Sequence, residues 1–296
     1  MKKMENMGGF FVAAITPFDE SGRFNPDALH ALMDRTIDQG AAGFLVGGSS
    51  AECPLLSHRE RLDGLVAAAN YAHRADTRLM ASVAAISTDE AREYARAAEK
   101  LKYDAMISTV PYYFKFGMKQ IAQYFVELRK AGDVPLFLYN FPGNTGVELD
   151  LGDDYIKGIL TDGTIAGVKQ TSLNLYQMER MKNLNDQLVV YGGYDEVYIG
   201  ARMLGADGAI GSTFNVTLPL FTKLEAAYSA KDYELAQKLQ RRANNIMQAF
   251  VSCSLFPSIK HILKVQGLDA GECREPFPTL TDEQKAYIEK VFAENI

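Results

Sequence analysis

Residues 135–140 have the sequence PLFLYN, and residues 165–172 have the sequence IAGVKQTS. Both are short apolar segments rich in β-forming residues, and their starts lie about 30 residues apart, the length of one strand–helix unit. Six more segments of this kind occur along the chain, and each is followed by a helical pattern. The eight predicted strands cover residues 10–18, 43–48, 78–84, 104–113, 135–140, 165–172, 188–193 and 208–213.

These segments are apolar on both faces, which is typical of parallel strands covered by helices. Eight strand–helix units in succession predict an α/β fold, the (β/α)8 TIM barrel. An open, doubly wound sheet is the alternative, but no GxGxxG motif stands at the first strand–helix turn. Helical patterns follow at residues 218–230, 233–251 and 281–294. We therefore predict a catalytic barrel over residues 1–225 and a C-terminal helical extension over residues 226–296.

Start and stop signals mark several of the predicted helices. Residues 57–60 and 87–90 each begin with Ser and end with Glu, the spacing of a capping box. Gly40 and Gly205 stand where helices are expected to end, as glycines commonly do. These signals agree with the strand–helix alternation.

The composition argues against nucleic acid and membranes as partners. A net charge of −6 does not provide the basic surface that binds phosphate backbones. The hydrophobic content of 47% is sufficient for a large core. No apolar run reaches the length of a membrane span, and residues 10–15 are too short for a signal-peptide core. Cys53, Cys253 and Cys273 form no CxxC pair, so we expect reduced thiols and a cytoplasmic protein.

Lys169 is the only lysine inside any of the eight predicted strands. The active site of a barrel forms at the C-terminal ends of its strands, and an ammonium buried there is costly. The structural alternative is an ion pair with a buried carboxylate, or a side chain that reaches water from the strand end. The functional interpretation is a desolvated amine that attacks a carbonyl carbon.

Two further strand ends offer polar groups. Tyr139 ends the fifth strand, next to the sixth in the barrel, where a phenol can move protons; the alternative is a core tyrosine with a satisfied hydroxyl. Residues 47–50, GGSS, offer backbone N–H groups and small side chains that suit a carboxylate. Gly-Ser turns are common, so this motif alone is weak.

Asp195 and Glu196 follow the seventh strand. Two carboxylates repel a phosphate but accept hydrogen bonds from a polyol. The alternative is an N-cap and the first turn of the next helix. No metal-ligand spacing joins the four histidines, which are His30, His58, His73 and His261. We therefore expect no metal ion, and covalent catalysis by a lysine would need no organic cofactor either.

Together these motifs resemble the family of pyruvate-dependent aldolases that includes N-acetylneuraminate lyase and dihydrodipicolinate synthase. The resemblance runs from about Gly8 through the helical tail, in the family's order. The motifs are residues 47–52, 111–113, 139–142, 169–172 and 211–213. The resemblance implies a barrel with a C-terminal helical bundle, usually in homotetramers, and a Schiff-base lyase that releases pyruvate from a keto-sugar acid.

Residues 169–172, 175–179, 193–196 and 211–213 look like the sialic-acid lyase branch of this family. That branch cleaves N-acetylneuraminate to N-acetylmannosamine and pyruvate, so we expect this activity.

The resemblance also implies a role for each motif. Lys169 would form the Schiff base, and Tyr139 would move the protons. Ser49 and Ser50 would hold the pyruvate carboxylate, with Ser49 also relaying to Tyr139. Tyr113 would complete this relay from a neighbouring subunit. The residues implied to line the sugar-chain pocket are Thr171, Gly193, Asp195, Glu196 and Ser212.

Three residues depart from the family's pattern. Ala51 replaces a glycine, and its methyl can narrow the carboxylate pocket or shift the turn. Asn144 stands where dihydrodipicolinate synthases have an arginine for a second carboxylate, which argues against that activity. Leu173 replaces a glycine of the lyase branch. The alternatives are a 2-keto-3-deoxy-sugar-acid aldolase of the same family and a non-catalytic sugar-acid sensor, which would have no use for the Lys169 amine.

Overall fold

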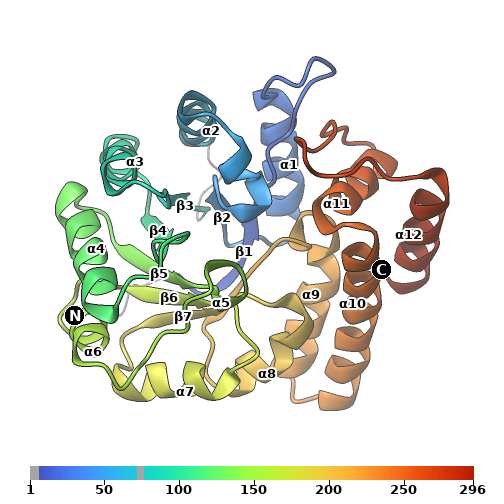
Figure 1. Cartoon of the computed structure of the whole chain (residues 1–296). Helices are drawn as coiled ribbons and strands as arrows, with labels where there is room; N and C mark the ends of the chain where they lie inside the picture. The colour runs from blue at the N-terminus through green and yellow to red at the C-terminus, as the bar shows by residue number, and fades with distance from the viewer. Residues whose placement is uncertain (1–6, 72–76) are drawn as a thin grey trace. The chain divides into compact units, whose positions relative to one another are not determined.

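The computed structural model describes residues 7–71 and 77–296. Its eight strands are parallel and form a closed barrel in the order of the sequence, with helices between them (Figure 1). The predicted (β/α)8 barrel is therefore confirmed, although each strand is shorter than the segment predicted for it. The strands are β1 Gly9–Ala13, β2 Gly43–Val46, β3 Arg78–Ser82, β4 Ala105–Thr109, β5 Leu136–Asn140, β6 Gly167–Gln170, β7 Val189–Gly192 and β8 Gly208–Gly211.

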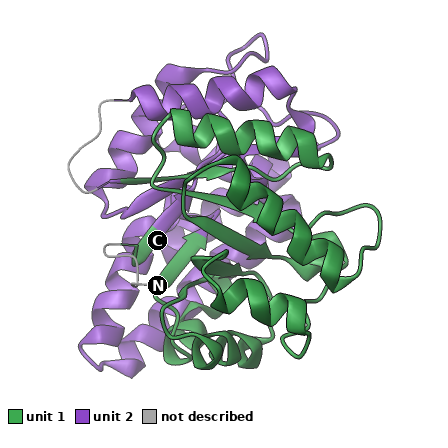
Figure 2. Cartoon of the chain, turned by 90° about the vertical axis from the view of Figure 1, so that its left-hand side faces the viewer, with its two compact units in different colours: residues 1–10, 78–210 green, residues 11–77, 211–296 purple. Residues whose placement is uncertain are grey.

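Two compact units make up the chain (Figure 2). The first combines residues 1–10, of which 7–10 are described, with residues 78–210, and the second combines residues 11–77 with residues 211–296. The predicted division after residue 225 is a different one and stays a prediction. Helix α9, Phe214–Ser229, runs through that point without a break.

In the first unit the strand register sets Tyr139, Lys169 and Tyr191 side by side on β5, β6 and β7. Gly167 permits this close packing, because an added Cβ would lie 2.3 Å from the Phe137 ring and 2.3 Å from the carbonyl oxygen of Val189. The helices of this unit are α3 Thr88–Lys100, α4 Met118–Ala131, α5 Pro142–Thr145, α6 Asp154–Thr161, α7 Leu175–Leu184 and α8 Tyr198–Met203, with a 3-10 turn, η3, at Asp195–Val197.

The second unit holds all three of the predicted C-terminal helices. Its elements include the 3-10 turns η1 Ser49–Ala51 and η2 Cys53–Leu55, and the helices α1 Pro26–Asp38, α2 His58–Asn70, α9, α10 Tyr233–Cys253, α11 Leu255–Val265 and α12 Asp282–Asn295. The three predicted C-terminal helices are confirmed as α9, α10 and α12. Helix α11 was not predicted. Only Ser254, with a φ of 96°, separates it from α10.

The helix signals of the sequence are confirmed in part. Ser57 and Glu60 form the reciprocal hydrogen bonds of a capping box at the start of α2. Residues 87–90 do not, so that prediction is wrong: the Ser87 side chain makes no capping bond, and a Glu90 carboxylate oxygen accepts the Tyr94 hydroxyl at 2.7 Å. Gly40 and Gly205 follow α1 and α8 with φ of 98° and 93°, the left-handed conformation expected after a helix end.

Within the described ranges, no single helix has the length and apolar composition to cross a membrane. Helices α10 and α11 meet that test only as a pair, with a bend of 115° between them.

Candidate active site

Lys169 lies on β6 with only 4% of its surface exposed. Its Nζ lies 4.3 Å from the centre of the Tyr139 ring, across the β5–β6 pairing. The amine forms no ion pair with any residue of 7–71 or 77–296. This arrangement excludes both structural alternatives for Lys169. Its amine has no carboxylate partner among the described residues, and its side chain does not extend into solvent.

Tyr139 is the first residue of an aromatic row in the first unit. Its ring stacks on Phe141 at 5.6 Å, and Phe141 meets the Tyr194 ring edge-on at 6.2 Å. Tyr139 is 7% exposed, yet its hydroxyl makes no hydrogen bond to a described residue. A core tyrosine normally has its hydroxyl satisfied. The phenol of Tyr139 is therefore available for proton transfer beside the Lys169 amine.

A buried amide network supports the strand ends that carry these two residues. The Asn140 amide donates to the side-chain oxygens of Gln170 at 2.8 Å and Gln177 at 3.1 Å. Gln170 also donates to Gln177 at 2.8 Å, and Gln177 donates to the carbonyl oxygen of Leu149 at 2.7 Å. Asn140 and Gln170 directly follow Tyr139 and Lys169 in the chain. The network therefore fixes the C-terminal ends of β5 and β6 relative to each other.

Thr171 and Gly193 lie in contact where β6 and β7 end. A Cβ on Gly193 would stand 1.8 Å from the Thr171 hydroxyl oxygen, so this position requires glycine. The Thr171 residue is 3% exposed, and its hydroxyl has no partner among the described residues. A buried hydroxyl in this state is available to a ligand.

Asp195 and Glu196 lie in the first turn of η3, whose N-cap is Tyr194. The structural alternative, an N-cap and the first turn of a helix, is therefore met only in part: both acids lie in the first turn, but Asp195 is not the N-cap. Burial raises the pKa of the Glu196 carboxyl, and a backbone hydrogen bond partly offsets this effect. Burial and the nearby Glu196 and Tyr139 also raise the pKa of Tyr194, which keeps that phenol protonated. The end of β7 thus presents two acids beside a phenol.

The second unit contains the predicted carboxylate-binding serines. Ser49 and Ser50 begin the 3-10 turn η1, which follows Gly47, a glycine with a φ of 73°. The Ser50 hydroxyl lies 2.6 Å from the Ser212 hydroxyl, at the end of β8. The structure thus brings together two serines to which the resemblance assigns different parts of the substrate.

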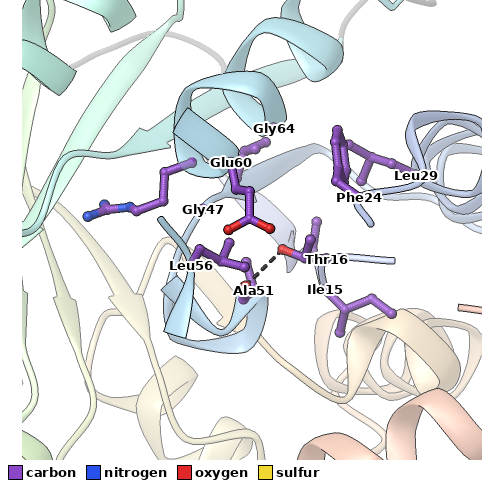
Figure 3. A pocket seen from close by; sticks show the side chains of 12 residues that line it. Ile15, Thr16, Phe24, Leu29, Gly47, Ala51, Leu56, Glu60 and Gly64 are labelled. Atoms are coloured by element: carbon purple, nitrogen blue, oxygen red, sulfur yellow. Dashed lines mark hydrogen bonds between the residues drawn. The ribbon is translucent and has the colours of Figure 1, made fainter. Parts of the chain in front are cut away.

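Ala51, the residue that departs from the family's glycine, lines a small pocket together with Thr16, Leu56 and Glu60 (Figure 3). The Thr16 hydroxyl donates to the carbonyl oxygen of Ala51 at 2.8 Å. Ala51 is 2% exposed, so its methyl is packed inside the unit. This contact holds the end of the turn against the segment after β1.

Tyr113 stands apart from the other predicted residues. It is 83% exposed, has a φ of 80°, and contacts the Phe114 ring edge-on at 5.0 Å. Within the part of the chain that the structure describes, it makes no hydrogen bond or ring contact with another predicted site residue. The predicted role of Tyr113 requires a second subunit and stays a prediction.

In residues 7–71 and 77–296, no three His, Cys, Asp or Glu side chains are grouped to hold a metal ion. His73 lies outside the described residues. Burial raises the pKa of the Cys53 thiol, and all three cysteines are unpaired.

The model of the dihydrodipicolinate synthetase family matches residues 6–295. The chain belongs to this family. The resemblance inferred from the sequence motifs is therefore confirmed.

Several relatives of this family member are described as lyases or aldolases. An N-acetylneuraminate lyase from Escherichia coli is 32% identical over 274 residues, which are 92% of this chain and 91% of that protein. CdNal from Clostridium difficile, solved in complex with mannosamine, has a TM-score of 0.93 at 30% identity over 98% of this chain and 99% of that chain. A Ruminococcus gnavus sialic acid aldolase, solved as a catalytic lysine mutant, has a TM-score of 0.92 at 28% identity over 100% of both chains.

The family and these relatives confirm the predicted enzyme class, a carbon–carbon lyase of the aldolase type. As a family member, the protein acts on small keto acids and pyruvate.

Neither the amide network nor the contact of Thr16 with Ala51 was predicted from the sequence. Asn140, Gln170 and Gln177 all lie in stretches that carry the resemblance, but no chemical role was assigned to them. Their position within these motifs was the available signal. It did not show that three amides would meet, because contacts between separate strands and a helix depend on the folded chain.

Proposed function

We propose that this protein is an N-acetylneuraminate lyase, which cleaves its substrate to N-acetylmannosamine and pyruvate through a Schiff base on Lys169. The observation that carries the proposal is the buried Lys169 amine, which lies 4.3 Å from the centre of the Tyr139 ring and forms no ion pair with a described residue. An amine held at this position beside a phenol is placed to attack a carbonyl carbon.

The first half of the cycle joins enzyme and substrate. The Lys169 nitrogen adds to the C2 carbonyl of the open-chain keto acid, and the carbinolamine loses water to give a cationic imine. Tyr139 supplies and removes protons in these steps, since its hydroxyl is not engaged with a described residue. Ser49 and Ser50 hold the substrate carboxylate.

The second half breaks the C3–C4 bond. Tyr139 helps to remove the proton of the C4 hydroxyl, which becomes the aldehyde of N-acetylmannosamine. The bonding electrons move into the imine and give an enamine. Protonation at C3 and hydrolysis of the imine then release pyruvate and restore the Lys169 amine. These steps use only groups of the protein and water.

Substrate choice rests on the groups at the ends of β6 and β7. Thr171 offers a buried hydroxyl without a described partner, and Asp195 and Glu196 offer carboxylates that accept hydrogen bonds from a polyol tail. The same two charges disfavour a phosphorylated substrate. Asn144, in place of the arginine of dihydrodipicolinate synthases, argues against a second substrate carboxylate.

We also propose that the protein forms a homotetramer in the cytoplasm. Three exposed aromatic residues follow β4. The Phe114 ring contacts the ring of Tyr113 on one side and that of Phe116 on the other. An exposed aromatic group of this kind suits a contact between subunits. The three unpaired cysteines fit a reducing compartment.

The test is a pyruvate-release assay on a panel of sugar acids. The panel contains N-acetylneuraminate, 2-keto-3-deoxy-gluconate, its 6-phosphate, and pyruvate with aspartate semialdehyde in the condensing direction. We expect the highest kcat/KM for N-acetylneuraminate and weak or no activity with the phosphate and the semialdehyde. Preference for the short 2-keto-3-deoxy acid would assign the protein to the sugar-acid aldolases instead, and no turnover of any member would favour a binding protein.

A further inference from the structure

A second lysine, Lys260 on α11, is also buried among the described residues, and it has a carboxylate partner. Its Nζ lies 2.8 Å from a carboxylate oxygen of Glu52, and the two side chains are 2% and 0% exposed. Both residues belong to the second unit. The pair thus connects the C-terminal helices of that unit to the turn after β2.

Glu52 receives further hydrogen bonds from the segment after α11. The backbone N–H of Arg274 donates to its other carboxylate oxygen at 2.6 Å. The Cys273 thiol also hydrogen-bonds the Glu52 carboxylate, and burial raises the pKa of this thiol to about 12, so that it stays a donor. Lys260 in turn donates to the carbonyl oxygen of Glu272 at 3.0 Å.

The ring of Phe18 covers the cations of this cluster. The Lys260 Nζ lies 4.2 Å from the ring centre, and the guanidinium carbon of Arg274 lies 4.6 Å from it. Arg274 also forms an ion pair with Glu60 and donates to the carbonyl oxygen of Gly22 at 2.8 Å. The pair is therefore enclosed by cation–π contacts and hydrogen bonds on several sides.

The position of Glu52 in the backbone makes this pair relevant to the site. Glu52 directly follows Ser49–Ala51 and has a φ of 60°, a left-handed conformation that is unfavourable for a residue with a side chain. Its N–H donates to the carbonyl oxygen of Ser49 at 3.0 Å and closes the turn. The carboxylate contacts hold this conformation in place.

Stability alone is a weak explanation for a pair of this kind. A buried ion pair often contributes no more to folding than apolar residues of similar size, because both charges lose their hydration. What the pair does supply is a close contact between charges at one backbone position. Thr16 and Ser212 contact Ala51 and Ser50 in the same turn, so the turn is fixed at three successive residues.

We propose that Lys260 is a positioning residue: through Glu52 it holds the turn that carries Ser49 and Ser50 in the geometry that binds the substrate carboxylate. This inference rests on the proposed function, because it assigns these serines to the carboxylate of pyruvate. Lys260 acts only through Glu52 and does not contact the reacting atoms.

The experiment measures imine formation on the full-length enzyme. Wild-type protein and Lys260→Met are incubated with increasing pyruvate, reduced with borohydride, and the reduced adduct is quantified by mass. The matched control is Lys264→Met on the same helix, where the lysine pairs with Asp269 at the surface, the side chains being 64% and 58% exposed. Methyl pyruvate, which lacks the negative charge, is titrated in parallel.

We expect Lys260→Met to raise the half-saturating pyruvate concentration by about tenfold or more, the effect of weakening hydrogen bonds to a charged group. The maximal amount of adduct should be unchanged, the methyl ester should be affected much less, and Lys264→Met should behave as wild type. Lys260→Arg, which keeps the charge, should recover part of the affinity. Equal losses for pyruvate and its ester would indicate general damage to the fold and overturn the proposal.

Removal of one partner of a buried pair can prevent folding. The double variant Glu52→Gln with Lys260→Met leaves no charge uncompensated, and it decides the question if Lys260→Met does not fold. A folded variant that binds pyruvate as wild type does, or failure of both variants to fold, would reject the positioning role. A wild-type protein that forms no adduct would instead reject the Schiff-base function itself.

Discussion

Lys169 and Tyr139 are register partners on neighbouring strands, and the Lys169 Nζ lies over the Tyr139 ring at 4.3 Å from its centre. The contact places a buried amine beside a phenol whose hydroxyl is not bound to a described residue. Covalent catalysis at a carbonyl needs this combination, a nucleophile and a proton carrier within reach of one another.

Borohydride reduction in the presence of pyruvate should add one reduced pyruvate to the protein, on the peptide that contains Lys169. The physical reason is that this amine is buried beside the Tyr139 phenol and forms no ion pair with a described residue, so it is placed to attack the keto group. Peptide mapping by mass spectrometry is the measurement. Lys260→Met serves as a comparison, because it removes the other lysine that is buried among the described residues and leaves Lys169 in place. Labelling at another lysine, or undiminished labelling of Lys169→Ala, would contradict the mechanism.

Replacement of Tyr139 by Phe should lower kcat by about 10²–10⁴, the usual share of general acid–base catalysis. The ring, its stacking on Phe141 and its contact with the Lys169 amine are retained in this variant, so only the hydroxyl is lost. Steady-state kinetics should show the loss of kcat, whereas imine trapping with borohydride should still occur, at a lower rate. An unchanged kcat would mean that another group moves the protons.

Glu196→Ala and Asp195→Ala should each raise KM for N-acetylneuraminate much more than for a short keto acid. Both acids lie in the first turn of η3, and a lost hydrogen bond to a charged group costs about 1.5–3 kcal/mol. Glu99→Ala, on the exposed face of α3, is the control and should leave both constants unchanged. If the wild type prefers a short keto acid and Asp195→Ala does not change that preference, the two acids have only a structural role in the turn η3.

The pH dependence of KM should follow the Glu196 carboxyl. Burial raises its pKa above the ordinary value of 4.5, and the ionised form accepts stronger hydrogen bonds, at both of its oxygens, than the protonated form does. As the pH falls through this raised pKa, the carboxylate becomes protonated, and KM for the long substrate should rise at a pH above 4.5. The rise should be absent in Glu196→Gln and with a short keto acid. The same rise in Glu196→Gln would assign it to another group.

Gly193→Ala should raise KM and lower stability by about 1–3 kcal/mol, the usual effect of overpacking. The added Cβ would lie 1.8 Å from the Thr171 hydroxyl oxygen and 2.9 Å from its Cβ, so Thr171 must move. Gly158→Ala in α6 is the matched control, since nothing lies within 4 Å of its added Cβ. That variant should gain roughly 0.5–1 kcal/mol from helix propensity. Thermal unfolding and steady-state kinetics distinguish the two, and wild-type values for Gly193→Ala would reject the proposed contact.

The sequence by itself was sufficient for the barrel, for three of the four C-terminal helices and for the placement of Lys169 in a strand. Each of these depends on local pattern: apolar segments at regular spacing, helix periodicity, and one lysine where strands are otherwise apolar. The capping box at residues 57–60 is also local, and it was predicted correctly. The similar motif at 87–90 was not, because Tyr94 takes the carboxylate of Glu90 in the folded helix.

Only the tertiary structure decided which buried charges have partners. Lys169 and Lys260 are both buried lysines, but Lys260 faces Glu52 and Lys169 faces an aromatic ring. The Ser50 and Ser212 hydroxyls meet across 162 residues of sequence, and Arg274 reaches Glu52 across 222. No periodicity connects residues so far apart, because barrel closure and helix packing, rather than the neighbouring residues in the chain, set the directions of these side chains. For the same reason the ion-pair alternative for Lys169 remained open until the fold placed each carboxylate.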